Sequence, residues 1–350
     1  MSNLPLTLGF LAFTSYHEPG GTAKQSLEDT IKLFQFAESR NFDGGWLRVR
    51  HFERALTGVF PFLGALARET DSIRIGTAVI PIAHENPVRL AEDSATADIL
   101  SDQRLEIGVS TGIASVGEVS DVFARAYGHE DGRSVGERSQ AVLGGFLRNI
   151  AGEEVAPTDP GFRLQFTDEG EGARIYPHSP RLSERIWYGS GTESSVIRAA
   201  RLGLNLQVST INTAGTTDLT VPQEQALFFD RYSENLDLSG IEKTVSDVRP
   251  RQISISRYVV PYSTQREKDL FLAASDRHVP KWPTLNGQGW NVGTVDEVIE
   301  QLLADEAIAR ARREFNTTLL LNLPSTLGLE WTRHLLEKVQ EEVFPALTAS

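Results

Sequence analysis

Arg50 and His51 are the first pair of side chains in this chain that could do chemistry. A guanidinium offsets negative charge on a bound cofactor or on an oxygen intermediate, and an imidazole moves protons near neutral pH. A surface ion pair and a structural histidine are the alternative interpretation. Arg50 ends an expected strand over 43–50 and His51 follows it, and parallel α/β folds bind ligands beyond the carboxyl ends of their strands. We therefore predict that Arg50 and His51 are catalytic.

A second candidate is the turn Ser190, Gly191 and Thr192, which opens an expected helix with Ser195 in its first turn. Free backbone amides, two hydroxyls and the helix dipole can hold a phosphate there. An ordinary capped helix explains the same pattern equally well, because such turns are common. The turn follows an expected strand over 185–189, and this position at a strand end favours an anion-binding site.

Four further side chains each have two interpretations. His84 and Glu85 are either loop residues or ligand contacts, and Trp282 and Trp290 either close over an apolar substrate or pack against the protein. The seven histidines show no metal-binding spacing, and no Gly-x-Ser-x-Gly motif is present. The absence of cysteine excludes thiol catalysis, thiolate metal ligands and disulfides.

Composition limits the partners and the compartment. The chain has 350 residues, is 40% hydrophobic and carries a net charge of −13, which argues against nucleic acid or an anionic membrane as a partner. The N-terminal segment MSNLPLTLGFLAF has neither a basic segment nor a small-residue cleavage site. No apolar run approaches the roughly 18 residues of a membrane span. We predict a soluble, cytoplasmic protein.

The elements that position these residues are clearest over 73–112, which reads as strand, turn, helix and strand. Asn86 is the expected helix cap and Pro87 the first helical residue. Two turns of this unit, 78–86 and 110–115, face the expected ligand-binding edge. The expected apolar face of the helix consists of Leu90, Ala91, Ala95 and Ile99, and the second strand contains Leu105, Ile107 and Val109.

About eight such units follow one another, so the pattern predicts one (β/α)8 barrel over 1–350. A helix capped by Ser26 follows the first strand, and another helix is closed by Gly203. We interpret 151–181, with the pieces FRLQFT and ARIYP, as a surface hairpin insertion, 113–133 as a loop at the mouth, and 261–292 as a lid. The expected strands lie at 6–13, 43–50, 73–80, 105–109, 185–189, 205–209, 252–260 and 317–323.

Several ordered motifs give the chain a family resemblance. They are FDGGWLRVRHF, IRIGTAVIP, NPVRLAED, ILSDQRLEIGVSTG, TESSVIRAARLGL, WNVGT and EEVFPAL. In this order and spacing they resemble the luciferase-like flavin monooxygenases, whose best-known member is the bacterial luciferase α subunit. The resemblance implies a TIM-type barrel that binds FMN supplied in reduced form by a separate reductase. It also implies oxygen addition at flavin C4a, giving a hydroperoxide that attacks an organic substrate.

The resemblance also assigns cofactor-binding positions. The family's non-proline cis peptide beneath the isoalloxazine corresponds to Ala78-Val79, and the flavin-facing end of the next strand to Ser110 and Thr111. The phosphate-binding turn corresponds to Gly191, Thr192 and Ser195, next to Ser190.

Four positions depart from the family pattern. The Glu-His-His-Phe run of luciferase reads Val49, Arg50, His51, Phe52 here, so Arg50 replaces the catalytic histidine. Thr111 replaces an arginine that reaches the FMN phosphate, and Ser110 replaces a reactive cysteine. A charged hydrogen bond contributes about 1.5–3 kcal/mol, so we expect FMN to bind some tens of times more weakly unless another cation substitutes. Light emission from long-chain aldehydes is not expected.

The leading hypothesis is a two-component flavin monooxygenase that oxygenates a small, apolar organic substrate. The alternatives are a deazaflavin-dependent oxidoreductase that transfers hydride and a flavin-binding protein without catalysis. A homodimer is the family expectation, and the apolar residues for a subunit contact would be Phe60, Phe62, Leu63, Leu66, Leu90 and Ala91. The alternative is that these residues only cover the barrel.

Overall fold

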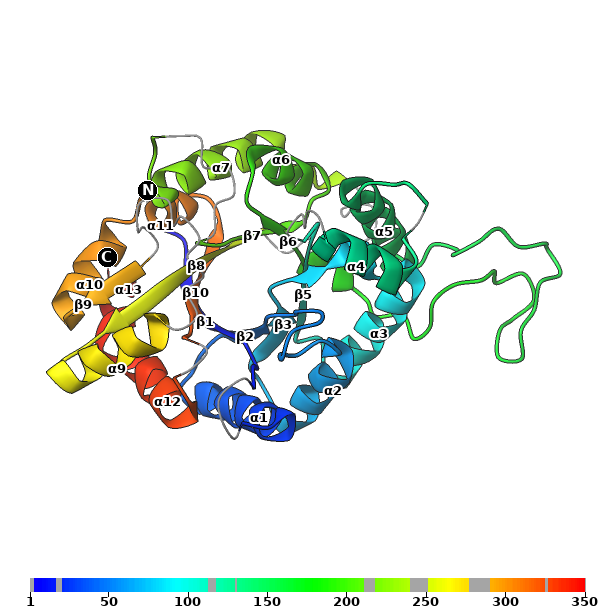
Figure 1. Cartoon of the computed structure of the whole chain (residues 1–350). Helices are drawn as coiled ribbons and strands as arrows, with labels where there is room; N and C mark the ends of the chain where they lie inside the picture. The colour runs from blue at the N-terminus through cyan, green and yellow to red at the C-terminus, as the bar shows by residue number, and fades with distance from the viewer. Residues whose placement is uncertain are drawn as a thin grey trace.

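Parallel strands close on themselves in the computed structural model, which describes residues 3–16, 21–112, 118–129, 131–210, 218–239, 251–276, 290–324 and 327–349. Within these residues, eight strands pair side by side in the order β10-β1-β2-β3-β5-β6-β7-β8, and β8 pairs with β10 to complete the ring (Figure 1). The predicted (β/α)8 barrel is confirmed. The ring strands are β1 (Leu6–Ala12), β2 (Gly44–Leu47), β3 (Arg74–Thr77), β5 (Leu105–Ser110), β6 (Ile186–Ser190), β7 (Asn205–Val208), β8 (Gln252–Pro261) and β10 (Asn316–Asn322).

Helices surround this ring, as Figure 1 shows. They follow the strands along the chain, so each carboxyl strand end leads into a connection at the same rim. Two short strands lie outside the ring order: β4 (Ile80–Pro81) pairs with β5, and β9 (Trp290–Gly293) pairs with β8. The helices are α1 (Ala23–Ser39), α2 (Val59–Glu69), α3 (Pro87–Leu100), α4 (Glu118–Tyr127), α5 (Val135–Ile150), α6 (Glu193–Arg201), α7 (Val221–Asn235), α9 (Gln265–Asp276), α10 (Val295–Leu303), α11 (Glu306–Ala311), α12 (Leu329–Lys338) and α13 (Phe344–Thr348).

Two tryptophans fill the barrel interior. The rings of Trp46 and Trp187 meet edge to face at 6.5 Å, and both side chains are fully buried. The indole of Trp187 donates to the buried Glu106 carboxylate at 2.5 Å, and Glu106 pairs with Arg74 at 3.6 Å. Gly76 is required beside this cluster because a Cβ there would lie 2.8 Å from Trp46 Cδ1. The interior is therefore packed side chain, as in other barrels of this type.

The expected unit over 73–112 is present in the structure. The Asn86 side chain accepts hydrogen bonds from the backbone N–H groups of Val88 and Arg89, and Pro87 is the first residue of α3. The predicted cap is thus confirmed. Ile99, however, is 43% exposed, so its assignment to the buried face of α3 is wrong. The buried face instead passes through Ser94 and Asp98, because Asp98 accepts from Arg185 at 2.6 Å.

Two other helix ends differ from the prediction. Thr22 caps α1 by accepting from the N–H of Gln25, whereas Ser26 lies inside the helix and donates to the Ser15 carbonyl. The sequence offers a hydroxyl at both places, and the tertiary contact of Ser26 decides between them. At the end of α6, Leu202 is the C-cap residue, and Gly203 follows it with a φ of +61°.

The segments predicted as insertions differ in how much regular structure they contain. FRLQFT and ARIYP form no strand, although Ala156 and Ala173 pair in one antiparallel bridge within a long loop that projects from the barrel (Figure 1). The first part of the predicted lid contains α9, and Trp290 in β9 stacks on Tyr258 with ring centroids 4.0 Å apart. Packing is therefore the interpretation that applies to Trp290. Trp282 lies outside the described residues.

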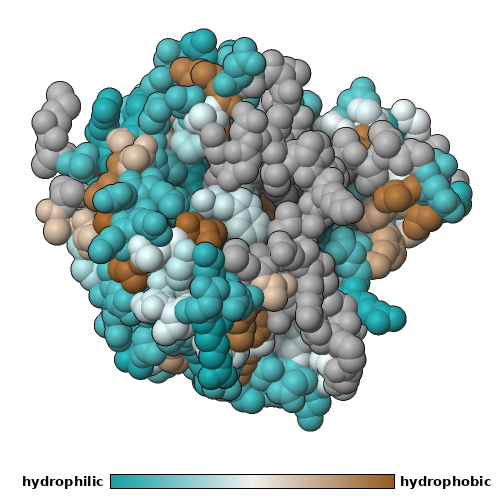
Figure 2. Space-filling view, turned by 60° about the vertical axis from the view of Figure 1, so that its left-hand side comes forward, coloured by the Kyte–Doolittle hydropathy of each residue, from teal (hydrophilic) through white to brown (hydrophobic). Residues whose placement is uncertain are grey.

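Most apolar residues predicted for a subunit contact are buried within the chain itself. Phe62, Leu63, Leu66, Leu90 and Ala91 are at most 7% exposed and belong to the main core, so their use as a dimer surface is wrong. Among the coloured residues of the face in Figure 2, most are hydrophilic, and hydrophobic ones lie in separate groups. The homodimer stays a prediction. None of the helices in the described ranges is both long enough and apolar enough to span a bilayer.

Candidate active site

The predicted site residues lie at the carboxyl ends of four strands that are neighbours in the ring. Arg50 and His51 follow β2, Ala78-Val79 lies between β3 and β4, and Ser110 and Thr111 stand at the end of β5. Ser190 ends β6 and leads into the turn before α6. The structure thus brings these residues to one rim, as parallel strands require. Their roles in catalysis and cofactor binding stay predictions.

The peptide bond Ala78-Val79 is cis, at the place that the resemblance implied. Ala78 packs on the interior cluster of Leu11, Trp46 and Leu320, so it forms the floor of the rim. Val79 leans toward β6 because Gly189 has no side chain: a Cβ there would lie 2.8 Å from Val79 Cγ1. The Cβ position of Gly189 is also 3.4 Å from Ser110 Cβ. Ala78, Val79, Ser110 and the backbone of Gly189 therefore form one small apolar surface above the tryptophans.

The turn before α6 is a capping box. The hydroxyl of Thr192 accepts from the N–H of Ser195, and the hydroxyl of Ser195 accepts from the N–H of Thr192 and donates to its carbonyl. The ordinary capped helix of the alternative interpretation is therefore present. It does not exclude a ligand, because the Ser190 hydroxyl, next to this turn, is buried and has no hydrogen-bond partner in the described structure. Ser190 is 7% exposed.

A cation that the sequence did not single out lies beside this turn. Arg198 Nη1 donates to the Tyr188 hydroxyl at 3.4 Å, and that hydroxyl is 3.1 Å from Thr111 Oγ1. We call Thr111, Tyr188, Ser190 and Arg198 the phosphate corner. Spacing offered one signal for Arg198, because it lies three residues after Ser195 and so shares its helix face. An arginine on a surface helix is too common for this spacing to be decisive.

A second group of side chains collects above β2 and β4. The His51 Nδ1 atom and the Tyr127 hydroxyl share a hydrogen bond of 2.7 Å. His84 stacks on Tyr127 at 4.8 Å and on His129 at 5.4 Å, and its ring lies 4.8 Å from that of Phe123. We call His51, His84, Phe123, Tyr127 and His129 the histidine cluster. Helix α4 supplies Phe123 and Tyr127, so the described part of 113–133 is largely helical, and the prediction of a loop there is wrong. Residues 113–117 and 130 lie outside the described structure.

Burial keeps the histidine cluster neutral. Desolvation, together with the nearby His129, His51 and Arg138, lowers the pKa of His84 from 6.5 to about 4. Burial also lowers the pKa of His51 and of His129. Desolvation and the charge of Asp93 raise the pKa of Glu85, and burial and Glu85 raise that of Tyr127. The imidazoles are therefore mostly uncharged at neutral pH.

Arg50 stands apart from both groups. Its guanidinium lies 3.9 Å from the Glu53 carboxylate, and its side chain is 31% exposed. A partly exposed pair at that separation is weak, so Arg50 keeps most of its freedom to reorient. Among the described residues, no group of three His, Cys, Asp or Glu side chains is arranged to hold a metal ion.

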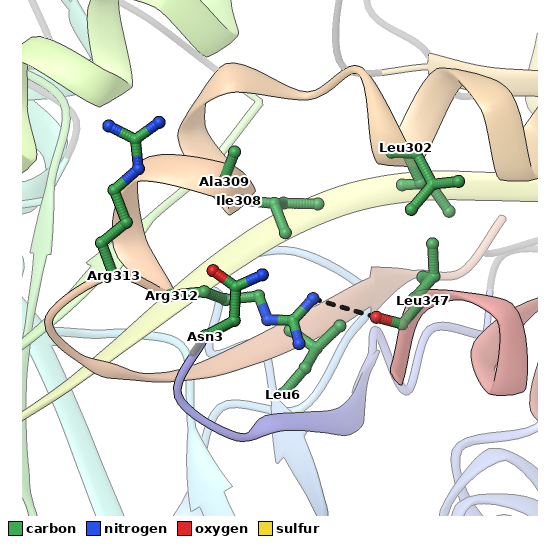
Figure 3. A pocket seen from close by; sticks show the side chains of 9 residues that line it. Asn3, Leu6, Leu302, Ile308, Ala309, Arg312, Arg313 and Leu347 are labelled. Atoms are coloured by element: carbon green, nitrogen blue, oxygen red, sulfur yellow. Dashed lines mark hydrogen bonds between the residues drawn. The ribbon is translucent and has the colours of Figure 1, made fainter. Parts of the chain in front are cut away.

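A separate cavity lies at the opposite end of the barrel. It has a volume of about 230 Å³, and Leu6 at the start of β1 lines it together with Asn3 and Arg313. Figure 3 shows Arg312 donating to the Leu347 carbonyl, at 2.9 Å, beside this cavity. Because amino-terminal strand ends in barrels serve stability, we assign no chemistry to it.

Comparison with known proteins agrees with this arrangement. The family model for luciferase-like monooxygenases matches residues 8–222. The oxygenase component of a flavin-dependent trigonelline monooxygenase from Acinetobacter baylyi is 22% identical, over 94% of this chain and 92% of that protein. The alkanal monooxygenase alpha chain of Photobacterium phosphoreum is 28% identical, over 63% of this chain and 59% of that protein.

Solved structures share the fold at lower identity. The oxygenating constituent of 3,6-diketocamphane monooxygenase from Pseudomonas putida, in complex with FMN, has a TM-score of 0.69 at 16% identity, with 98% of each chain covered. An F420-dependent secondary alcohol dehydrogenase has a TM-score of 0.61 at 16% identity, with 99% of each chain covered. The family match spans more than half of the sequence, and the chain therefore belongs to the luciferase-like monooxygenase family.

Proposed function

We propose that this chain is the oxygenase component of a two-component monooxygenase that uses reduced FMN and O2 to oxygenate a small, apolar organic substrate. Family membership together with the rim geometry supports the proposal. The trigonelline relative is named as an oxygenase component, which supports a separate reductase as the partner that delivers reduced FMN. Bound reduced FMN would supply the electrons that activate O2.

The residues at the rim fit a flavin mononucleotide in two respects. The apolar surface of Ala78, Val79 and the bare backbone of Gly189 suits a flat aromatic ring system. The buried Ser190 hydroxyl lacks a partner, and Arg198 offers positive charge beside it, which suits a phosphate. Ser110, Thr111, Gly191, Thr192 and Ser195 are the proposed cofactor-binding residues between these two points.

Two side chains have proposed catalytic roles. Arg50 would turn from Glu53 toward the rim and stabilise negative charge that develops during oxygen activation. His51 would accept a proton: when Nδ1–H donates to the Tyr127 oxygen, Nε2 presents a lone pair. Nε2 is buried and has no hydrogen-bond partner among the described residues, so this lone pair is not used within the described structure. Tyr127 is then a positioning residue that fixes the tautomer of His51.

The aromatic character of the histidine cluster supports an apolar substrate. Phe52 is 60% exposed and packs on Phe123 at 4.9 Å, so rings border the mouth on the side of β2. Neutral imidazoles next to these rings add little charge to that side. This side of the rim therefore suits a small apolar molecule better than a charged one.

The proposal is tested by anaerobic titration of the protein with reduced FMN, oxidised FMN and reduced deazaflavin. Trp46 lies beneath Ala78, so a bound flavin is expected to quench tryptophan fluorescence saturably. Oxygen is then admitted, and its consumption is compared with that of free reduced FMN. Binding of none of the three contradicts the cofactor assignment, and anaerobic turnover with reduced deazaflavin supports hydride transfer instead. Tight flavin retention without extra oxygen consumption supports a protein without catalysis.

A further inference from the structure

We propose that Arg198 supplies the positive charge for the flavin phosphate, from α6 instead of from the turn after β5. The inference rests on the proposed function, because it concerns the phosphate of the same cofactor. Three observations support it: the position of the guanidinium and, among the described residues, the absence of a competing carboxylate and of a hydrogen-bond partner for the Ser190 hydroxyl. Each concerns a residue of the phosphate corner.

The helix directs Arg198 toward the turn. Side chains of an α-helix tilt toward its N-terminus, so a residue at position 198 covers the turn that contains Ser195. The Arg198 guanidinium also reaches the preceding strand, where Nη1 donates to the Tyr188 hydroxyl at 3.4 Å. Tyr188 in turn lies 3.1 Å from Thr111. The cation is therefore held between the first turn of α6 and the end of β5, next to Thr111.

Nothing in the described part of the chain neutralises this charge. Arg198 forms no ion pair there, and it donates a hydrogen bond to the neutral phenol of Tyr188. The acidic residue of the same helix, Glu193, is paired with Arg231 at 3.1 Å. Arg198 is only partly exposed, so its charge is held at a defined place instead of being dispersed in solvent. A fixed cation without a carboxylate partner is suited to an external anion.

Neutral donors complete the corner. Ser190 and Tyr188 lie two residues apart in β6 and so point to the same side of the strand. The Ser190 hydroxyl is buried, is 7% exposed as a residue, and has no partner among the described residues. The N-terminus of α6, nine residues long, adds the positive end of its dipole. A cation, a free buried hydroxyl and a helix N-terminus together favour a phosphate over an uncharged group.

The experiment compares two ligands that differ only in the phosphate. Reduced FMN and reduced riboflavin are titrated anaerobically, and tryptophan quenching gives each dissociation constant. The variants are Arg198→Ala, Arg198→Gln and Arg198→Lys, with circular dichroism as the check on folding. Arg201→Ala is the matched control, because Arg201 lies one turn further along α6 and contacts Asn235 at 3.5 Å.

Wild-type protein is expected to bind FMN more tightly than riboflavin. Arg198→Ala and Arg198→Gln should weaken the binding of reduced FMN about 10- to 100-fold, or about 1.4–2.8 kcal/mol. The dissociation constant of reduced riboflavin should not change. Arg198→Lys should restore part of the affinity, and Arg201→Ala should change neither ligand. Added salt should weaken FMN binding to the wild type more than to Arg198→Ala.

Other results overturn the inference. Unchanged FMN affinity in a folded Arg198→Gln protein removes Arg198 from the phosphate site. Equal loss of FMN and riboflavin assigns Arg198 a structural role only. If the wild-type protein binds both ligands with equal affinity, the phosphate corner does not bind the flavin phosphate, but the assignment of a flavin cofactor is unaffected. If wild type binds neither ligand, the proposed function fails as well.

Discussion

The phosphate corner and the histidine cluster stand on the same rim of the barrel but are built differently. The corner lies at β5, β6 and α6, and its elements are a fixed cation, hydroxyls and a helix end. The histidine cluster lies at β2, β4 and α4 and consists of stacked, uncharged rings. In the proposed reaction, the first side holds the phosphate of the cofactor, and the second receives an apolar substrate and a proton. This difference suggests that cofactor binding and substrate handling are separable by mutation.

Arg50→Ala is expected to have the largest effect, because Arg50 is the proposed catalytic cation beyond the end of β2. Loss of charge stabilisation in a reaction step typically lowers turnover by about 10²–10³-fold. Product formation with reduced FMN, O2 and an organic substrate is the measurement, and circular dichroism should show an unchanged fold. Arg54→Ala, which removes an exposed arginine four residues on, is the control. Unchanged turnover in Arg50→Ala would remove this residue from the mechanism.

Gly189→Ala tests the flat surface between the two regions. The new Cβ would lie 2.8 Å from Val79 Cγ1, and overpacking of this kind costs about 1–3 kcal/mol. We expect reduced FMN and reduced riboflavin to weaken together, by about tenfold, in contrast to the phosphate-selective effect of Arg198→Ala. Gly64→Ala in α2 is the control, since a Cβ there meets nothing within 4 Å. If Gly189→Ala weakened the binding of reduced FMN but not of reduced riboflavin, the proposed separation of the ring surface from the phosphate corner would be wrong.

Tyr127→Phe keeps the stacked ring and removes the hydrogen bond to His51. A hydrogen bond contributes about 0.5–1.5 kcal/mol, so turnover should fall by about 2- to 10-fold. Flavin affinity should not change, because Tyr127 lies outside the phosphate corner. The pH dependence of kcat is the readout that separates tautomer control from packing, and it should shift in this variant only. Tyr262→Phe serves as the matched tyrosine control, and an unaltered pH profile in Tyr127→Phe would argue against the positioning role.

The smallest expected effect is the dependence of the free energy of unfolding on pH. The pKa of His84 is 6.5 when unfolded and about 4 when folded, so the unfolded state binds more protons between these values. The free energy of unfolding should therefore fall as pH is lowered from 6.5 toward 4. The lowered pKa values of His51 and His129 act in the same direction, and the raised pKa of Glu85 opposes them.

Denaturant unfolding at several pH values measures this dependence. His84→Phe keeps an aromatic ring and should flatten the dependence of the free energy of unfolding on pH in the acidic range. An identical pH dependence in wild type and His84→Phe would show that the histidine cluster does not couple to folding.

The sequence predicted the parts of the molecule that local rules determine. Short buried strands followed by capped helices lead to a closed parallel barrel, and strand ends then fall on one rim. For this reason His51, Ala78 and Thr111 could be placed near one another in advance, and Asn86 could be recognised as a cap. The resemblance added the cis peptide at Ala78-Val79, which no spacing rule would have given.

The parts that escaped prediction depend on long-range packing. Tyr127 and His129 reach the site because α4 docks on His84, and no residue of α4 is fully buried, so its pattern carries no core signal. Arg198 became a candidate only when Tyr188 and Thr111 were seen beside it. Helical spacing predicts that Ile99 lies on the buried face of α3. The buried ion pair of Asp98 and Arg185 instead places Asp98 on that face and leaves Ile99 exposed.

The packed tryptophans below Ala78 have a kinetic consequence. Because Trp46 and Trp187 fill the interior, all reactants of the proposed reaction would reach the site from the rim. A molecule that sits deepest must then enter first and leave last. This arrangement predicts ordered binding, in which reduced FMN binds before the organic substrate. It also predicts that oxidised FMN inhibits the reaction by competing with reduced FMN.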